Sequence, residues 1–172
     1  MSNMTAAPEV PELKRAAGIL FVRGDRKILL MRRASGDYPG AWALPGGGVE
    51  EGETAAECAL RETLEEAGFE YSGELIPWTR RRADGVDYTT FVGSVPDGFE
   101  PALNPEHDDC MWVDRQFALA AAPVLHPGLP IALQRFEMNE LDIAKAIQAG
   151  QLSSPQRYRN LMLVALRITG TG

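Results

Sequence analysis

The sequence predicts an α/β fold, in which a mixed, mostly antiparallel sheet lies between helices as an α/β/α sandwich, with an extra C-terminal helical segment. Three observations predict it. Short apolar runs of strand length recur between residues 16 and 113. A capped amphipathic helix is expected at residues 54–67, after the first apolar runs, and a second helical pattern lies at residues 115–122. With 172 residues and 45% hydrophobic content, the chain can bury one core, so we expect a single domain.

The first elements form a β-hairpin. Residues 16–22 are an apolar run typical of a buried strand, residues 27–32 supply its neighbour, and the polar residues 23–26 form the turn. After a loop, residues 42–45 are expected to be a short extended piece. The glycines Gly46–Gly48 then predict a break in regular structure, because glycine destabilises strand and helix interiors.

The helix at residues 54–67 has signals at both ends. Thr54 can act as the N-cap, and Glu57 follows at the capping-box spacing. Gly68 then ends the helix. Two strands are expected after it, at residues 75–79 and 88–95, and Arg80–Arg82 with a turn at Asp84 and Gly85 join them. A loop at 96–105, a strand at 110–113 and a helix at 115–122 follow.

The chain divides into three expected parts. Residues 1–13 form a flexible lead-in, residues 14–126 form the main domain, and residues 127–172 form a C-terminal extension that packs on the domain or follows it. In this extension Pro127 and Pro130 interrupt the chain before a capped helix at 140–149. The final residues are compatible with one piece of a longer polypeptide and equally with a short natural tail.

Composition narrows the classes of function. The net charge of −7 argues against a surface that coats polymeric nucleic acid, since neutralising backbone phosphates requires an excess of lysine and arginine. A small phosphorylated ligand stays compatible, because a divalent cation can bridge acidic side chains to an anionic substrate. No apolar run approaches the roughly 20 residues of a membrane helix. The N-terminus lacks the basic start and apolar stretch of a secretory signal, so we expect a cytoplasmic protein without a membrane partner.

The few cysteines and histidines argue against a transition-metal site. Cys58 and Cys110 lie far apart without a Cys-x-x-Cys pair, and His107 and His126 are the only histidines. Each histidine is interpreted as a surface or capping residue, because no spacing typical of zinc occurs. Any metal should therefore be a hard cation bound by oxygen.

Three glutamates share one face of the helix at 54–67. With 3.6 residues per turn, Glu62, Glu65 and Glu66 fall within an arc of about 100°, and the opposite, apolar side can pack on the sheet. A bound Mg²⁺ would reverse their mutual repulsion, since it prefers oxygen ligands. For the helix alone, a solvated acidic face with ion pairs to Arg61 is the simpler interpretation. The preceding glycines favour the interpretation as a cation site, because they let the backbone approach a ligand closely.

The segment GGVEEGETAAECALRETLEEAGF, residues 47–69, resembles the Nudix box, in which glycine, glutamate and the Arg-Glu-apolar-any-Glu-Glu-any-Gly core recur at fixed spacing. Seven matches of this kind arise by chance on the order of once in 10⁸ starting points. Thr63 departs from the pattern, which has a bulky apolar residue there, and this puts local packing in doubt. The likeness extends over residues 16–122. The invariant positions are held by Gly47, Glu53, Arg61, Glu62, Glu65, Glu66 and Gly68.

The resemblance implies a Mg²⁺-dependent hydrolase, with Mn²⁺ as a substitute, and a metal site on the box. Glu65 and Glu66 would be the principal metal ligands, and Gly47 would add its backbone carbonyl. Glu62 would either ligate the metal or act as the general base.

The resemblance also implies two supporting roles. Arg61 would pair with Glu53 to brace the loop against the helix. A further ligand or base usually comes from a later loop, for which Glu106 is the candidate, with a solvated turn carboxylate as the alternative. The residues expected to take part in catalysis are thus Arg61, Glu62, Glu65 and Glu106.

The implied reaction is attack of water on a diphosphate whose charge is neutralised by Mg²⁺. Arg32, Arg33 and Arg81 are candidates for holding further phosphate groups, with surface solubility as the alternative. We expect a small nucleoside-diphosphate-linked substrate and a monomer or homodimer. A (deoxy)nucleoside triphosphate pyrophosphohydrolase is the first choice. The alternatives are a hydrolase of nucleoside-diphosphate sugars or dinucleoside polyphosphates, and a catalytically idle nucleotide-binding or scaffold module.

Overall fold

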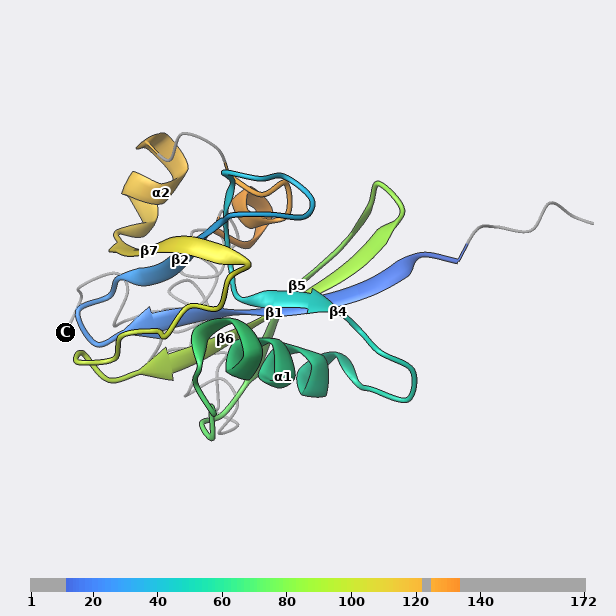
Figure 1. Ribbon diagram of the computed structural model, residues 1–172, viewed down its shortest axis with the longest axis horizontal. Coiled ribbons are helices and arrows are strands. Elements are labelled where there is room, and N and C mark those ends of the chain that lie inside the picture. Colours follow the sequence, from blue (N-terminus) through green and yellow to red (C-terminus); the bar gives the residue numbers. More distant parts are fainter. Residues whose placement is uncertain (1–11, 122–124, 134–172) are drawn as a thin grey trace, which may run out of the picture.

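The computed structural model describes residues 12–121 and 125–133 of the chain. Within them, seven strands form one mixed sheet, in which five of the six strand pairs are antiparallel and β1 and β6 run parallel (Figure 1). The predicted α/β fold with a mixed, mostly antiparallel sheet is confirmed. The strands are β1 (Lys14–Arg23), β2 (Ile28–Arg33), β3 (Trp42–Ala43), β4 (Gly46–Gly48), β5 (Ile76–Ala83), β6 (Val86–Val95) and β7 (His107–Val113).

Strand β1 lies at the centre of the sheet. It pairs with β6 along its whole length, and its other edge is shared by β4 near its start and β2 at its end. Side chains alternate between the two faces, so Ile19 and Phe21 join one buried cluster while Leu20 and Val22 join the other. The apolar run that predicted a buried strand is therefore buried on both faces.

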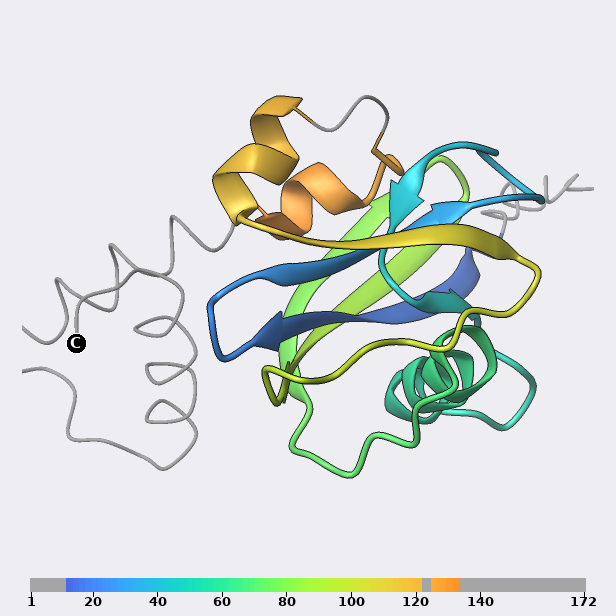
Figure 2. The ribbon, with the colours of Figure 1, turned by 60° about the vertical axis from the view of Figure 1, so that its left-hand side comes forward.

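Helices cover the two faces of the sheet (Figure 2). α1 (Ala55–Ala67) packs on one face through its buried residues Cys58 and Ala59. α2 (Arg115–Ala121) packs on the opposite face, where Ala118 is fully buried. Both helices lie where the sequence predicted them. No helix in the described ranges is long and apolar enough to cross a membrane.

Several strands differ from the sequence-based expectation. Gly46–Gly48 do not break the structure but form β4, which pairs antiparallel with residues 16–18 of β1. The pattern misses this strand because its ladder is made by backbone groups alone and leaves no alternation of side chains. β5 continues through Arg80–Arg82, and β7 begins at His107 instead of residue 110, since pairing with β6 and β2 extends both strands past their apolar residues.

The described part of the predicted C-terminal extension packs into the core. A helical segment begins at Leu129 with Pro130 in its first turn, where a missing N–H costs no helix hydrogen bond, so Pro130 does not interrupt it. The indole Nε1 of Trp78 donates to the Ala132 carbonyl at 3.0 Å in the buried cluster. The helix expected at 140–149 and residues 1–11 of the predicted lead-in lie outside the described residues.

Candidate active site

Helix α1 carries the acidic face, and the expected caps fix both of its ends. The Thr54 hydroxyl accepts from the Glu57 N–H at 3.2 Å, and the Glu57 carboxylate accepts from the Thr54 N–H at 2.8 Å. Gly68 ends the helix in the left-handed region at a φ of 61°. Thr63 is fully buried, and its hydroxyl donates to the Ala59 carbonyl at 2.8 Å, so its polar group is satisfied inside the core.

The glycine strand β4 lies directly against this acidic face. The Gly46 N–H donates to Glu66 Oε2 at 2.8 Å. A Cβ atom on Gly47 would lie 2.4 Å from Glu62 Oε1, so the missing side chain is what admits the Glu62 carboxylate. β4 therefore brings the backbone within contact distance of two glutamates.

Arg61 ties the helix to the loop before it. Its guanidinium donates to Glu53 at 2.9 and 3.1 Å, to the Gly48 carbonyl at 2.9 Å and to Glu62 at 2.8 Å. It also lies 3.3 Å from Glu65. Hydrogen bonding to Arg61 lowers the pKa of Glu53. One charged side chain thus bridges the loop, β4 and the helix.

The three helix carboxylates differ in exposure. The side chain of Glu65 is 55% exposed, that of Glu62 14% and that of Glu66 3%. Burial raises the pKa of Glu62, and it raises the pKa of Glu66 to about 8 despite the hydrogen bond from Gly46. Glu66 is therefore buried whereas Glu65 is exposed, so the three carboxylates do not form the uniformly solvated acidic face of the simpler interpretation.

The loop before β7 closes the site from another side. The Asn104 N–H donates to the Glu66 carbonyl at 3.2 Å, which docks the loop on the last turn of α1. Burial is the main cause of the raised pKa values of Glu62 and Glu66, and the negative charge of Glu106 raises both further. Glu106 therefore lies near the acidic face. His107 is buried, with Nδ1 3.9 Å from Glu66 Oε1. Its interpretation as a surface or capping residue is wrong.

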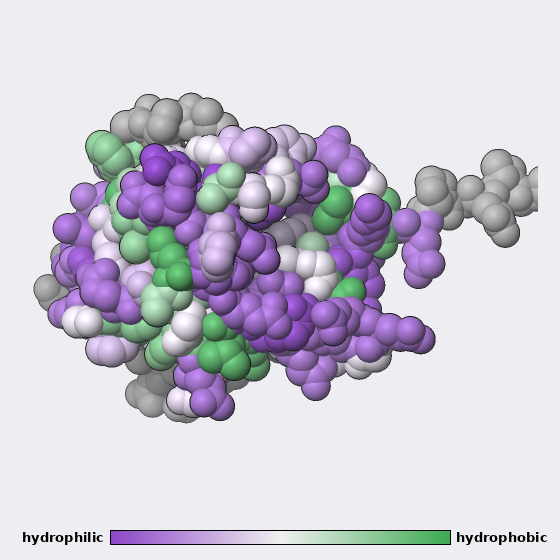
Figure 3. Space-filling view, viewed as in Figure 1, coloured by the Kyte–Doolittle hydropathy of each residue, from purple (hydrophilic) through white to green (hydrophobic). Residues whose placement is uncertain are grey.

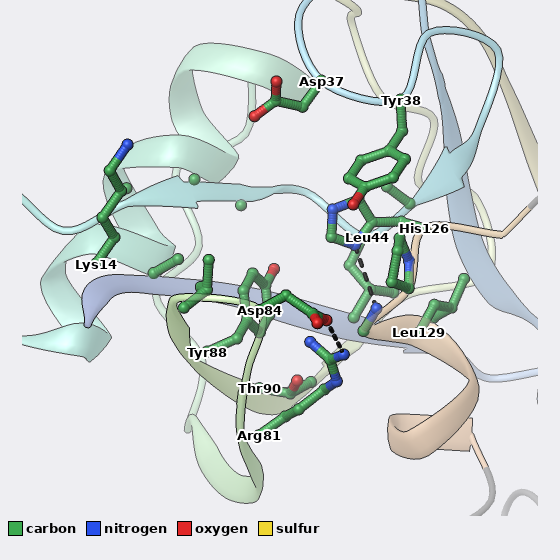
Figure 4. A pocket seen from close by; sticks show the side chains of 18 of the residues that line it. Lys14, Asp37, Tyr38, Leu44, Arg81, Asp84, Tyr88, Thr90, His126 and Leu129 are labelled. Atoms are coloured by element: carbon green, nitrogen blue, oxygen red, sulfur yellow. Dashed lines mark hydrogen bonds and ion pairs between the residues drawn. The ribbon is translucent and has the colours of Figure 1, made fainter. Parts of the chain in front are cut away.

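A cavity of about 730 Å³ opens beside β4. The surface is hollowed on this side, with mostly hydrophilic residues around the hollow (Figure 3). Gly46–Gly48 line it, together with side chains from β1, β2, β5, β6 and the loops around Tyr38 and His126 (Figure 4). Segments far apart in the sequence therefore build one cavity next to the acidic helix.

Tyr38 and His126 line the part of the cavity away from Lys14, and Tyr88 lies between them and Lys14 (Figure 4). The ring centroids of Tyr38 and His126 lie 5.3 Å apart at 82°, and Tyr88 lies 6.5 Å from His126. Tyr38 is 53% exposed and has a φ of 57°, which is uncommon for a residue with a side chain. Burial lowers the pKa of His126, so its imidazole is neutral near pH 7. This end of the cavity suits a flat ring.

Basic side chains also line the cavity. Arg81 pairs with Asp84 at 2.6 Å, as Figure 4 shows, and Arg33 Nε donates to the Asp37 carbonyl at 2.6 Å. Lys14 lies on the same lining. The cavity can therefore attract an anion even though the helix beside it is acidic.

The chain matches a known family, since a model of the NUDIX domain covers residues 12–134. The chain belongs to the Nudix hydrolase family. The "Nucleoside triphosphatase NudI" of Escherichia coli O17:K52:H18 is 37% identical over 109 residues, which are 54% of this chain and 77% of that protein. The "Putative 8-oxo-dGTP diphosphatase 3" of Mycobacterium tuberculosis (strain H37Rv) is 34% identical over 132 residues, which are 70% of this chain and 60% of that protein.

Solved structures share the Nudix fold. The MutT protein of Methanosarcina mazei superposes with a TM-score of 0.63 at 23% identity, covering 77% of this chain and 98% of that chain. The Nudix hydrolase RenU of M. smegmatis has a TM-score of 0.60 at 27% identity, covering 76% and 87%. The family and the fold implied by the Nudix box are therefore confirmed.

The three arginines expected to hold phosphate groups do not lie together in this Nudix domain. Arg33 and Arg81 line the cavity, whereas Arg32 does not. Arg32 pairs with Asp108 at 2.7 Å and lies 5.8 Å from the ring centroid of Trp42. Arg32 and Arg33 are neighbours on β2, the register with β7 shifts between them, and only Arg33 lines the cavity. Arg32 therefore does not fit the phosphate-binding role.

Members of the Nudix family typically use a divalent metal ion. The donor chemistry of the site fits one, because Glu62, Glu65 and Glu66 supply carboxylate oxygen atoms and a divalent cation would stabilise the charged form of the buried Glu66. Within residues 12–121 and 125–133, however, no three His, Cys, Asp or Glu side chains already form a metal-binding group. The guanidinium of Arg61 contacts one oxygen of each of two carboxylates, Glu62 Oε1 and Glu65 Oε2, so a cation can use the second oxygen of each.

Sequence reasoning missed three residues of the site, His107, Tyr38 and His126, which all lie outside the Nudix box. His107 carries no pattern, because its burial depends on how the loop docks on α1. Tyr38 and His126 lie in loops, far apart in the chain. A large aromatic residue between Asp37 and Pro39, in an otherwise turn-forming segment, is the signal that could have identified Tyr38.

Proposed function

We propose that this Nudix hydrolase is a divalent-cation-dependent pyrophosphohydrolase of (deoxy)nucleoside triphosphates. One observation carries the proposal. Gly46 and Gly47 contact Glu66 and Glu62 and also line the cavity. The carboxylates suited to a cation therefore adjoin a cavity of the size that small-molecule sites have. The names of the two relatives, a nucleoside triphosphatase and an 8-oxo-dGTP diphosphatase, support this substrate class.

The acidic residues would hold the cation and move a proton. Glu62, Glu65, Glu66 and the Gly47 carbonyl are the proposed ligands for Mg²⁺ or Mn²⁺. A bound divalent cation supplies positive charge that neutralises diphosphate oxygens and lowers the pKa of water. Glu62 and Glu106 are the two candidates for the carboxylate that accepts the proton of the attacking water.

The remaining residues would orient the substrate. Arg33 and Arg81 would pair with phosphate oxygens of the substrate. The nucleobase would then reach Tyr38 and His126 at the aromatic end. Arg61 would keep the loop and the acidic helix in register through its bonds to Glu53.

A panel of diphosphate compounds tests the proposal. Nucleoside triphosphates, nucleoside-diphosphate sugars and dinucleoside polyphosphates are incubated with Mg²⁺, Mn²⁺ or a chelator, and released phosphate, pyrophosphate and monophosphate are measured. We expect nucleoside monophosphate and pyrophosphate from triphosphates, and no turnover with the chelator. Faster cleavage of another class would replace the proposed substrate. Binding without cleavage of any compound would indicate an idle nucleotide-binding module.

Gly47→Ala is expected to lower kcat/KM by about 10²-fold with little loss of stability, because small misplacement of a reacting group has effects of this size. The new Cβ would lie 2.4 Å from Glu62 Oε1, and the flexible Glu62 side chain can move away while the backbone stays in place. Steady-state kinetics and thermal unfolding measure the two quantities.

Gly98→Ala is the matched control outside the site. A Cβ on Gly98 meets no atom within 4 Å and Gly98 does not line the cavity, so the kinetics of this variant should stay close to those of the unmodified enzyme. Equal activity of the Gly47 and Gly98 variants would contradict the proposed role of the Gly47–Glu62 contact.

Tyr38→Ala is expected to raise the KM for a nucleoside triphosphate about tenfold, because stacking of a base on an aromatic ring contributes about 1–3 kcal/mol. The expected change in kcat is smaller, since Tyr38 lies at the aromatic end of the cavity and not among the carboxylates. Phe117→Ala removes an equally exposed ring, 52% against 53%, outside the cavity lining and serves as the control. Identical KM values for both variants would remove Tyr38 from the substrate site.

A further inference from the structure

His107 is a buried imidazole that faces the acidic helix without a hydrogen bond of its own. Its side chain is 1% exposed, and neither ring nitrogen has a hydrogen-bond partner among the described residues. The nearest carboxylate oxygen is Glu66 Oε1, 3.9 Å from Nδ1. A buried polar group of this kind is rare, because leaving it unpaired is unfavourable, and its position calls for an explanation.

Backbone hydrogen bonds hold His107 in this place. The Ala102 and Asn104 N–H groups donate to the carbonyls of Ala67 and Glu66 at 2.8 and 3.2 Å, which fastens the loop to the end of α1. The His107 N–H then donates to the Asn104 carbonyl at 3.1 Å. The imidazole is therefore aimed at Glu66 by the same loop that docks on the Glu66 backbone.

The Glu66 carboxylate has one oxygen fixed and one open toward the histidine. Oε2 accepts from the Gly46 N–H at 2.8 Å, while Oε1 is the oxygen nearest to His107. The separation of 3.9 Å is about 1 Å longer than a hydrogen bond, so a small side-chain rotation closes it.

We propose that His107 is a positioning residue for Glu66, with the Nδ1–H donating to Oε1 when Glu66 binds a divalent cation. The inference rests on the proposed function, because that function assigns Glu66 to the cation. The Gly46 N–H and the His107 imidazole then hold the carboxylate from two sides and fix the direction of its remaining lone pairs. Ligating carboxylates that are hydrogen-bonded in this way bind metal more tightly than free ones.

Amide variants of His107 separate this role from packing. The side-chain nitrogen of asparagine can occupy the position of Nδ1, whereas that of glutamine occupies the position of Nε2. Mn²⁺ binding to the nucleotide-free protein is measured by calorimetry for the unmodified chain and for His107→Asn, His107→Gln and His107→Leu. Thermal unfolding checks that each variant is folded, and kinetics at saturating Mn²⁺ report whether the KM for nucleotide changes.

We expect His107→Gln and His107→Leu to weaken Mn²⁺ binding about 10- to 100-fold, and His107→Asn to retain most of the affinity. The KM for nucleotide at saturating Mn²⁺ should stay constant. If His107→Leu does not fold, the contrast between the asparagine and glutamine variants decides. Equal Mn²⁺ affinity of all folded variants would show that His107 only packs. Absence of Mn²⁺ binding by the unmodified protein would overturn the metal assignment itself, together with this inference.

Discussion

Glu65→Gln combined with Glu66→Gln is expected to lower kcat/KM for a nucleoside triphosphate by on the order of 10³-fold or more, because both changes remove groups proposed to hold charge at the reacting phosphate. The fold should persist. Glu65 is half exposed, and glutamine at position 66 can still accept the Gly46 N–H through its amide oxygen. Initial rates over a range of Mg²⁺ concentrations, together with circular dichroism, measure both outcomes.

The matched control removes the same two charges elsewhere. Glu51 and Glu70 are exposed and lie just outside the two ends of the helix, so Glu51→Gln with Glu70→Gln changes the net charge equally. The control should keep its Mg²⁺-dependent activity. If the two double variants turned over substrate at the same rate, the metal assignment to α1 would be wrong.

The metal-free protein is expected to lose stability as the pH rises from about 5 to about 8, by on the order of a few kcal/mol from Glu66 alone. Burial raises the pKa of Glu66 from 4.5 to about 8 in the folded state. The unfolded chain therefore releases this proton near the ordinary value, whereas the folded chain retains it. The contribution is fully present below the unfolded pKa and is lost as the pH approaches the folded one.

Urea unfolding isolates the contribution of Glu66 to the free energy of unfolding. It is measured with a chelator present, at several pH values, for the unmodified protein and for Glu66→Gln. The difference between the two proteins cancels the other titrating groups, such as His107 and Glu53. Glu66→Gln should gain stability relative to the unmodified protein toward pH 8. Saturating Mg²⁺ should remove that advantage, because the cation stabilises the charged carboxylate. A difference that does not change with pH would contradict the raised pKa.

The sequence predicted the acidic helix and its caps because those signals are local. Thr54, Glu57 and Gly68 act within one turn of their own positions, and the Nudix box fixes Gly47 at a set distance from them. It could not predict that Glu66 is buried and Glu65 is not. The helix period gives the angle between the side chains. Which of them is exposed depends on how β4 and the loop before β7 pack against α1.

The cavity was beyond sequence reasoning for a different reason. Its residues come from segments with no shared pattern, and only the sheet topology brings the Tyr38 loop, the β5–β6 hairpin and His126 together. Arg81 and Arg82 show the same difficulty for neighbouring residues. Both lie in β5, yet Arg81 lines the cavity while Arg82 pairs with Asp87 at 3.1 Å. Strand register decides between these two roles, and the arginine run does not reveal it.

The parallel pairing of β1 with β6 also sets the order in which the protein can assemble. Lys14–Arg23 pair with Val86–Val95, about 70 residues later, so the central ladder of the sheet closes around the segment that contains α1. During synthesis, β1 leaves the ribosome long before its partner exists. A strand that is apolar on both faces then waits with an open edge, which is a hazard for aggregation. The acidic helix packs on a complete β1–β6 pair only after residue 95 has emerged, and the slow step of folding is expected to be this closure.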